Sequence, residues 1–128
     1  KNLMKEIIED LVVRKNGKPV NRVEYANTLY QELGDPDKAI DILEEMRSEF
    51  LQIESILSIK GFDKNFISRR RWNQWQKAYP EVVNSLVYIY RKNDRNFDAE
   101  IVLSDWVLRN PKDTNAQEIL EQIRSGKK

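Results

Sequence analysis

The stretch that decides the fold is LGDPDKAI, at residues 33–40. A glycine suits the left-handed position just after a helix, and Asp followed by Pro is typical of the N-cap and first turn of the next helix. Apolar residues recur at intervals of three and four on both sides of this stretch. The sequence therefore predicts two helices, over residues 21–33 and 36–60, that are joined by a very short turn and pack antiparallel.

The second of these helices is predicted to be unusually long. Its steps of three and four continue from Ala39 to Leu57, and Gly61 follows as a stop. At about 1.5 Å per residue the helix would be roughly 37 Å long. Because its apolar surface is wider than one seam, we expect it to contact helices on more than one side.

The same periodicity predicts five further helices, and no stretch alternates with a period of two. They are expected over residues 3–15, 63–79, 80–90, 97–109 and 113–125. Asn21 and Asp63 are the predicted N-caps of the helices that they open, Pro80 should begin its helix, and Asp113 or Thr114 should cap the last one. The fold class is therefore all-α, with six to seven helices and one long central helix.

Two parts of the chain can be aligned on each other. Tyr30, Gly34, Ala39 and Leu43 have the same spacing as Tyr90, Asp94, Ala99 and Leu103. This spacing resembles the tetratricopeptide repeat (TPR), a helix–turn–helix unit of about 34 residues. The resemblance covers residues 20–51 and 80–123.

What the resemblance implies is a TPR-like α-α superhelix built from antiparallel helical hairpins. We expect a single domain over residues 1–128, with repeat-like units at about 20–51 and 80–111, an inserted helix at 62–79 and a capping helix at 113–125. Two departures stand against a regular solenoid: Asp94 replaces the usual glycine, and the units start 60 residues apart. The alternative is an ordinary helical bundle with the same hairpin spacing.

The amino-acid composition excludes several kinds of catalytic and metal-binding site. The 128 residues include no cysteine and no histidine, which excludes disulfides and thiol nucleophiles and removes the commonest metal ligand and general base. Residues 94–98 are spaced as a calcium loop begins, but the following glycine and the bidentate glutamate are missing. No metal and no cofactor is predicted. With no catalytic motif in the sequence, an enzyme is only the third possibility.

These features favour a non-catalytic protein–protein interaction or scaffold module. Because the chain begins on Lys1 rather than Met, we expect it to be one domain of a larger bacterial protein. Expected partners are a protein or peptide, or neighbouring domains of the same chain. The near-balance of 22 basic and 21 acidic residues argues against nucleic acid.

The TPR resemblance also implies where a partner would bind, because the concave surface of that family comes chiefly from the first helix of each repeat. The corresponding groove residues here are Asn21, Glu24, Thr28, Gln31, Glu81, Asn84, Tyr88 and Arg91. The family members that grip a C-terminal carboxylate use lysine and asparagine at such positions. Glu24 and Thr28 stand there in this chain, which argues against that ligand.

The segment SRRRWNQW, at residues 68–75, supports an alternative function. Arg69, Arg70 and Arg71 can bind phosphate in a bidentate manner, and Trp72 and Trp75 can stack on bases or lie at a membrane surface. The alternative is an accessory domain that docks on anionic lipid or nucleic acid, with only peripheral membrane contact. Residues 61–80 carry five basic residues and one acidic residue, the strongest local charge imbalance in the chain.

A structural interpretation of the same segment competes with this alternative. The apolar series of the long helix continues through Ile53, Ile56, Leu57 and Ile59. If these side chains were left exposed, they would form a hydrophobic patch prone to aggregation. We therefore expect residues 62–79 to fold back over the far half of the long helix. In that arrangement the tryptophans pack inward and the arginines mark the outer face.

Overall fold

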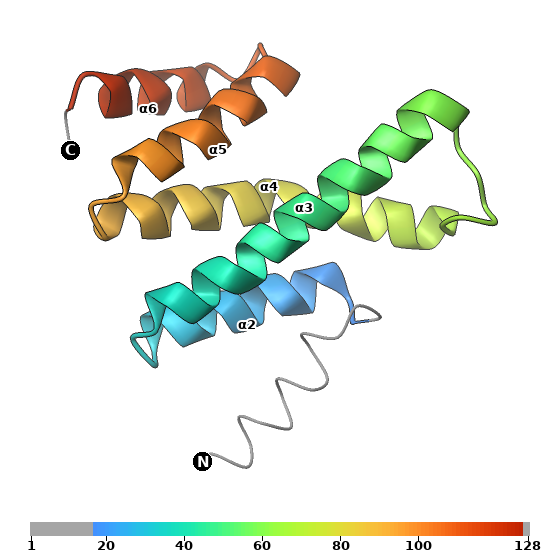
Figure 1. The fold of residues 1–128 in the computed structure, drawn as a ribbon, viewed down its shortest axis with the longest axis horizontal. Helices are drawn as coiled ribbons and strands as arrows, with labels where there is room; N and C mark the ends of the chain where they lie inside the picture. The colour runs from blue at the N-terminus through green and yellow to red at the C-terminus, as the bar shows by residue number, and fades with distance from the viewer. Residues whose placement is uncertain (1–16, 127–128) are drawn as a thin grey trace. The chain divides into compact units, whose positions relative to one another are not determined.

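A computed structural model describes residues 17–126 (Figure 1). These residues form five helices and no strand: α2 (Pro19–Gln31), α3 (Pro36–Lys60), α4 (Arg69–Lys92), α5 (Asn96–Arg109) and α6 (Thr114–Arg124). The all-α prediction is confirmed. The helix predicted over residues 3–15 lies outside the described residues.

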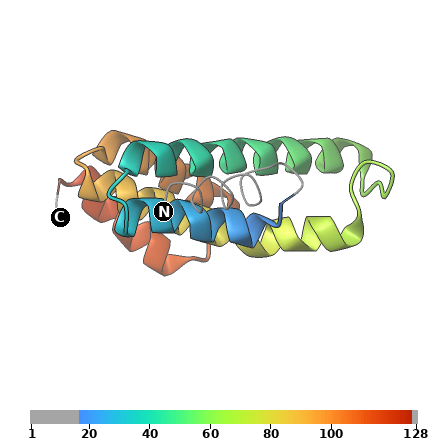
Figure 2. The same ribbon diagram turned by 90° about the horizontal axis from the view of Figure 1, so that it is seen from below.

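The turn between α2 and α3 has the predicted chemistry. Gly34 adopts a φ of +63°, where a residue with a side chain would be strained. The Asp35 carboxylate accepts a hydrogen bond from the Lys38 backbone amide at 3.1 Å, and Pro36 occupies the first turn. The two helices consequently pack side by side as an antiparallel pair (Figures 1 and 2).

Both ends of α3 are where the sequence places them. The helix runs for 25 residues from Pro36 to Lys60, and Gly61 follows with a φ of +78°. The start of α2 differs from the prediction. It begins at Pro19, with Lys18 as an N-cap that makes no side-chain hydrogen bond, so the proposed cap at Asn21 is wrong. Proline fixes φ at a helical value and suits the first position of a helix, so α2 begins at Pro19, before Asn21.

The helices predicted over 63–79 and 80–90 are a single helix, α4, with Pro80 in its interior. Asp63 is also not its cap: the Asp63 carboxylate accepts from the Asn65 amide at 2.9 Å in the preceding turn. The cap is Ser68, whose Oγ accepts from the Arg71 amide at 3.1 Å. An interior proline costs about 3 kcal/mol. Buried side chains on both sides of it oppose that cost: Ala78, Tyr79, Val82 and Val83.

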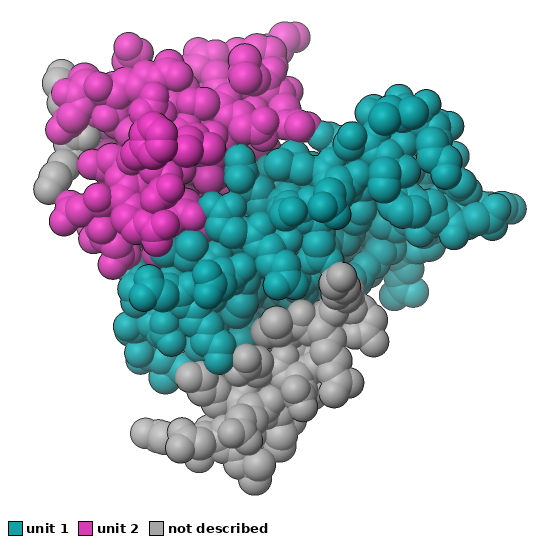
Figure 3. Space-filling model, in the orientation of Figure 1, with its two compact units in different colours: residues 1–82 teal, residues 83–128 magenta. Residues whose placement is uncertain are grey.

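The chain divides into two compact units, residues 1–82 and residues 83–128 (Figure 3). In the first unit, the Phe50 ring of α3 lies 3.9 Å from the Tyr79 ring and 5.3 Å from the Trp72 ring, both stacked, and 6.4 Å from the Trp75 ring. Trp72 and Trp75 are buried. The predicted packing of this segment on α3 is confirmed for these rings.

The far end of α3 is covered only in part. Leu57 is buried as expected, whereas Ile59 is 82% exposed, and Phe62 and Phe66 stay 39% and 42% exposed. The connection over residues 61–68 folds on itself instead, with the Phe66 and Ile67 amides donating to the Asp63 carbonyl at 3.0 and 3.1 Å. The two phenylalanines, which were expected to help cover this end of α3, therefore belong to a turn with its own hydrogen bonds and stay partly exposed.

The second unit contains the end of α4 with α5 and α6. Helices α5 and α6 pack on each other, and the Arg124 guanidinium of α6 lies 3.0 Å from the Glu100 carboxylate of α5. The predicted cap of the last helix is confirmed, since the Asp113 carboxylate accepts from the Ala116 amide at 3.0 Å. Asp94 adopts a φ of +58° in the turn between α4 and α5.

Candidate functional site

A groove of about 450 Å³ lies between α2 and the first half of α4, inside the first unit. Helical spacing explains its lining, because residues three and four apart share one helix face. The residues from the α2 side are Lys18, Pro19, Val20, Val23, Glu24 and Asn27, and those from α4 are Gln74, Lys77, Ala78 and Glu81.

The groove combines apolar side chains with amides and charges. Val23 and Ala78 are each only 3% exposed, whereas Val20 is 48% exposed to solvent. Asn27 and Gln74 come from opposite helices. A side-chain amide can both donate and accept, as the backbone of a bound peptide requires. The lining also carries two lysines and two glutamates, so its formal charge is balanced.

A buried ion cluster joins the helices of the first unit. Arg22 is fully buried, and its Nη2 lies 2.8 Å from Oε2 of Glu49 and 3.5 Å from Oε1 of Glu45, both on α3. Its guanidinium also lies 5.8 Å from the centre of the Trp75 ring on α4. The cluster therefore ties α2 to both α3 and α4.

Arg22 was not among the predicted site residues, although the sequence carries a signal for it. Arg22 is four and seven residues before Ala26 and Leu29, so it falls on the apolar stripe of α2. Glu45 and Glu49 are one turn apart on the next helix of an antiparallel hairpin. A charged residue on an apolar stripe, facing a pair of opposite charges, indicates a buried ion pair.

The three arginines proposed as an anion site have different surroundings. Arg71 is half-buried, and its Nη1 donates to the Gly17 carbonyl at 2.8 Å. Burial lowers the pKa of Arg71 below its usual value and the charge of Arg22 lowers it further, while Glu49 opposes the shift. The Arg69 guanidinium lies 3.6 Å from the centre of the Phe62 ring, and Arg70 is exposed. Arg71 therefore takes part in packing.

Of the eight groove residues implied by the TPR resemblance, Glu24 and Glu81 line the groove between α2 and α4. Asn21, Thr28 and Gln31 are exposed elsewhere on α2. In the second unit, Asn84 and Tyr88 are exposed and Arg91 is half-buried.

Lys18, Asn27, Gln74 and Lys77 line the groove but were not predicted. Gln74 and Lys77 were missed because the expected break at Pro80 assigned them to an inserted helix. Lys18 was missed because the start of α2 was placed too late. Asn27 is one residue from the predicted Thr28, so a rotation of about 100° per residue separates the two side chains.

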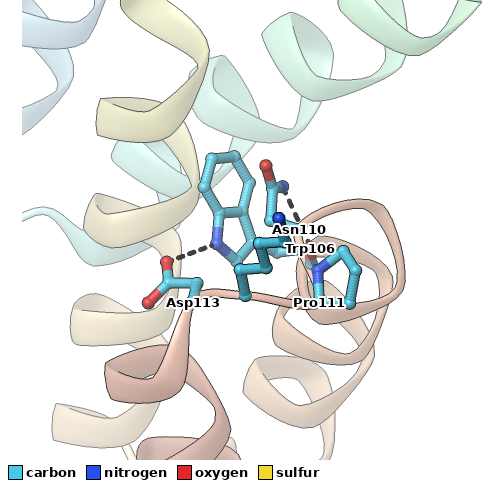
Figure 4. Close-up of a pocket in the computed structure, with 5 residues that line it drawn as sticks. Trp106, Asn110, Pro111 and Asp113 are labelled. Carbon is cyan, nitrogen blue, oxygen red and sulfur yellow. Dashed lines mark hydrogen bonds between the residues drawn. The ribbon is translucent and has the colours of Figure 1, made fainter.

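A second hollow, of about 370 Å³, lies where α5 meets α6 and is lined by Trp106, Asn110, Pro111, Lys112 and Asp113 (Figure 4). The Trp106 indole Nε1 donates to Oδ2 of Asp113 at 3.0 Å, and the Asn110 side chain donates to the Trp106 carbonyl at 3.0 Å. The Trp106 hydrogen bond lowers the pKa of Asp113, and the Ala116 amide adds to this effect. Both carboxylate oxygens of Asp113 therefore accept hydrogen bonds from residues of the α5–α6 region.

Comparison of the chain with protein-family models, with curated proteins and with solved structures found no match. Among residues 17–126, no group of three or more acidic, histidine or cysteine side chains is placed to hold a metal ion. None of the described helices combines the length and the apolar character needed to cross a membrane.

Proposed function

We propose that this chain is a non-catalytic protein–protein interaction module that binds a peptide segment of its partner in the groove between α2 and α4. The observation that carries the proposal is the lining of this groove. Buried Val23 and Ala78 accompany the exposed Val20, and two amide side chains come from facing helices. Concave sites of this kind bind ligands through apolar contact and orient them through a few polar groups.

The arrangement of amides specifies the kind of partner. Asn27 and Gln74 can hydrogen-bond to the backbone of an extended peptide, and the apolar residues can take one or two of its side chains. Lys18 and Lys77 can pair with acidic partner residues, and Glu24 and Glu81 with basic ones. The partner segment should therefore combine an apolar anchor with residues of both charges.

A TPR-like repeat pair is part of the same proposal, and the matched turn positions support it. Gly34 and Asp94 occupy equivalent places in the two aligned units and both have a positive φ, +63° and +58°. The aligned Ala39 and Ala99 are both fully buried. A small residue at this place lets two helices approach closely, as in helical-hairpin repeats.

Selection from a displayed peptide library provides the test. Peptides selected on the wild-type protein are titrated calorimetrically against Gln74→Ala and against Gln76→Ala, a change of the same residue type on the same helix. Gln76 is exposed and does not line the groove. Loss of about 1 kcal/mol, or roughly fivefold in affinity, is expected for Gln74→Ala alone. Equal affinities for both variants would contradict the proposal.

A further inference from the structure

The connection between α3 and α4 presents exposed apolar side chains. Ile59, Phe62 and Phe66 are 82%, 39% and 42% exposed and fall within eight residues of sequence. We call these three residues the apolar tip. Ile59 belongs to the last turn of α3, and Phe62 and Phe66 belong to the connection that follows it. This end of α3 is opposite the turn to α2 (Figure 1).

Local structure holds the tip in place. Gly61 turns the chain with a φ of +78°, and the Asp63 carboxylate and carbonyl accept hydrogen bonds from the amides of Asn65, Phe66 and Ile67 at 2.9–3.1 Å. The Arg69 guanidinium lies 3.6 Å from the centre of the Phe62 ring. The tip is therefore displayed by an ordered turn, which reduces the entropy lost when it is buried in a ligand.

Exposed cations lie next to the apolar tip in the sequence. Lys60, Lys64, Arg69 and Arg70 are all exposed. The acidic residue in this part of the chain, Asp63, lies 3.8 Å from the Lys60 ammonium, which offsets its charge. The connection between α3 and α4 thus combines apolar side chains with an excess of positive charge.

We propose that this end of the molecule docks on the surface of an anionic membrane, with the apolar tip entering the interface and the cations meeting lipid phosphates. Apolar side chains next to lysines and arginines are the combination that interfacial binding requires. Arginine can also hold a phosphate in a bidentate manner. The proposal goes beyond the peptide-binding function and uses none of the residues of the α2–α4 groove.

The composition of the tip favours lipid over nucleic acid. Single-stranded nucleic acid binds through stacking of bases on aromatic faces. Trp72 and Trp75 are buried, and Arg69 lies over the Phe62 ring. Ile59, the most exposed residue of the tip, has no ring on which a base could stack, but it can enter the acyl region of a bilayer.

Vesicle flotation tests the proposal. The full chain is mixed with vesicles of phosphatidylcholine alone and with vesicles that also contain phosphatidylserine. Binding is expected only to the anionic vesicles and should weaken as salt is added. Each cation near such a surface contributes a factor of about five, so Lys64→Gln/Arg70→Gln should lose roughly 30-fold in partition coefficient. The matched control is Lys92→Gln/Lys112→Gln, which removes two exposed lysines elsewhere and should bind as wild type.

The apolar half of the proposal has its own variant. Ile59→Ser/Phe66→Ser should weaken binding at low and at high salt, because it leaves the charges intact. Circular dichroism of each variant confirms that it folds. The proposal is overturned if the wild type does not float with anionic vesicles. It is also overturned if Lys64→Gln/Arg70→Gln and Ile59→Ser/Phe66→Ser both bind as well as the control. Binding to single-stranded RNA without binding to vesicles would assign the cations to nucleic acid instead.

Discussion

Trp75→Ala is the substitution that should damage the first unit most. The Trp75 ring is 2% exposed, lies 6.4 Å from the Phe50 ring and is 5.8 Å from the Arg22 guanidinium. Truncation of a buried tryptophan costs about 3–5 kcal/mol. Burial of about 200 Å² of aromatic surface at about 25 cal/mol/Å² gives a similar value, near 5 kcal/mol. We expect a loss of about 4 kcal/mol in the free energy of unfolding.

Urea denaturation followed by far-UV circular dichroism measures this loss. With a slope of about 2 kcal/mol per molar urea, the unfolding midpoint should fall by about 2 M. The control is Phe66→Ala, which truncates an aromatic residue of the same unit that is 42% exposed and should cost less than about 1.5 kcal/mol. If Trp75→Ala moves the midpoint no further than the control does, the packing of α4 on α3 is wrong.

Three further predictions concern the ion cluster, a cap and a turn. Glu49→Gln should cost about 3 kcal/mol because it leaves the buried Arg22 without its nearest partner, whereas Arg22→Met should cost far less; urea midpoints of the two variants must differ in this order. Asp113→Ala should lower stability by about 1 kcal/mol at pH 7. The pKa of Asp113 is lowered in the folded state, so its carboxylate stabilises the fold above about pH 4 and this contribution is lost as the pH falls further; the gap between variant and wild type should therefore be smaller at pH 3 than at pH 7. Asp94→Gly should raise the free energy of unfolding by about 0.5 kcal/mol, because glycine adopts a positive φ without strain, and Gly34→Ala should lower it by about 1 kcal/mol. Melting temperatures that shift in the same direction for both variants would contradict this description of the two turns.

Local chemistry made part of the fold predictable from the sequence. Gly34, Asp35 and Gly61 set the bounds of α3 through positive φ values and a side-chain cap, interactions that involve only neighbouring residues. Pro80 was misread for the opposite reason. Its local preference is to begin a helix, but buried residues on both sides of it stabilise one continuous helix, and such packing is not encoded within a short window.

The candidate site was less predictable than the fold. The TPR resemblance implied a groove that includes Glu24 and Glu81, and these two residues line the α2–α4 groove, whereas the other six implied residues do not. Asn27 and Gln74 share this groove only because α2 and α4 face each other, and they were not predicted. The lining of a groove between two helices depends on their rotation about their axes, which a sequence pattern specifies only to within a residue or two.

The central claim is that the partner binds between α2 and α4, and a chemical-shift map of the ¹⁵N-labelled protein tests it most directly. A peptide selected on the wild type is titrated into the protein, and the backbone and side-chain amide signals are followed. The account predicts that the largest changes fall on Val20, Asn27, Gln74 and Lys77, with little change at Gln76 or at the α5–α6 turn. Changes concentrated at Trp106 and Asp113, with none on α2, would contradict it.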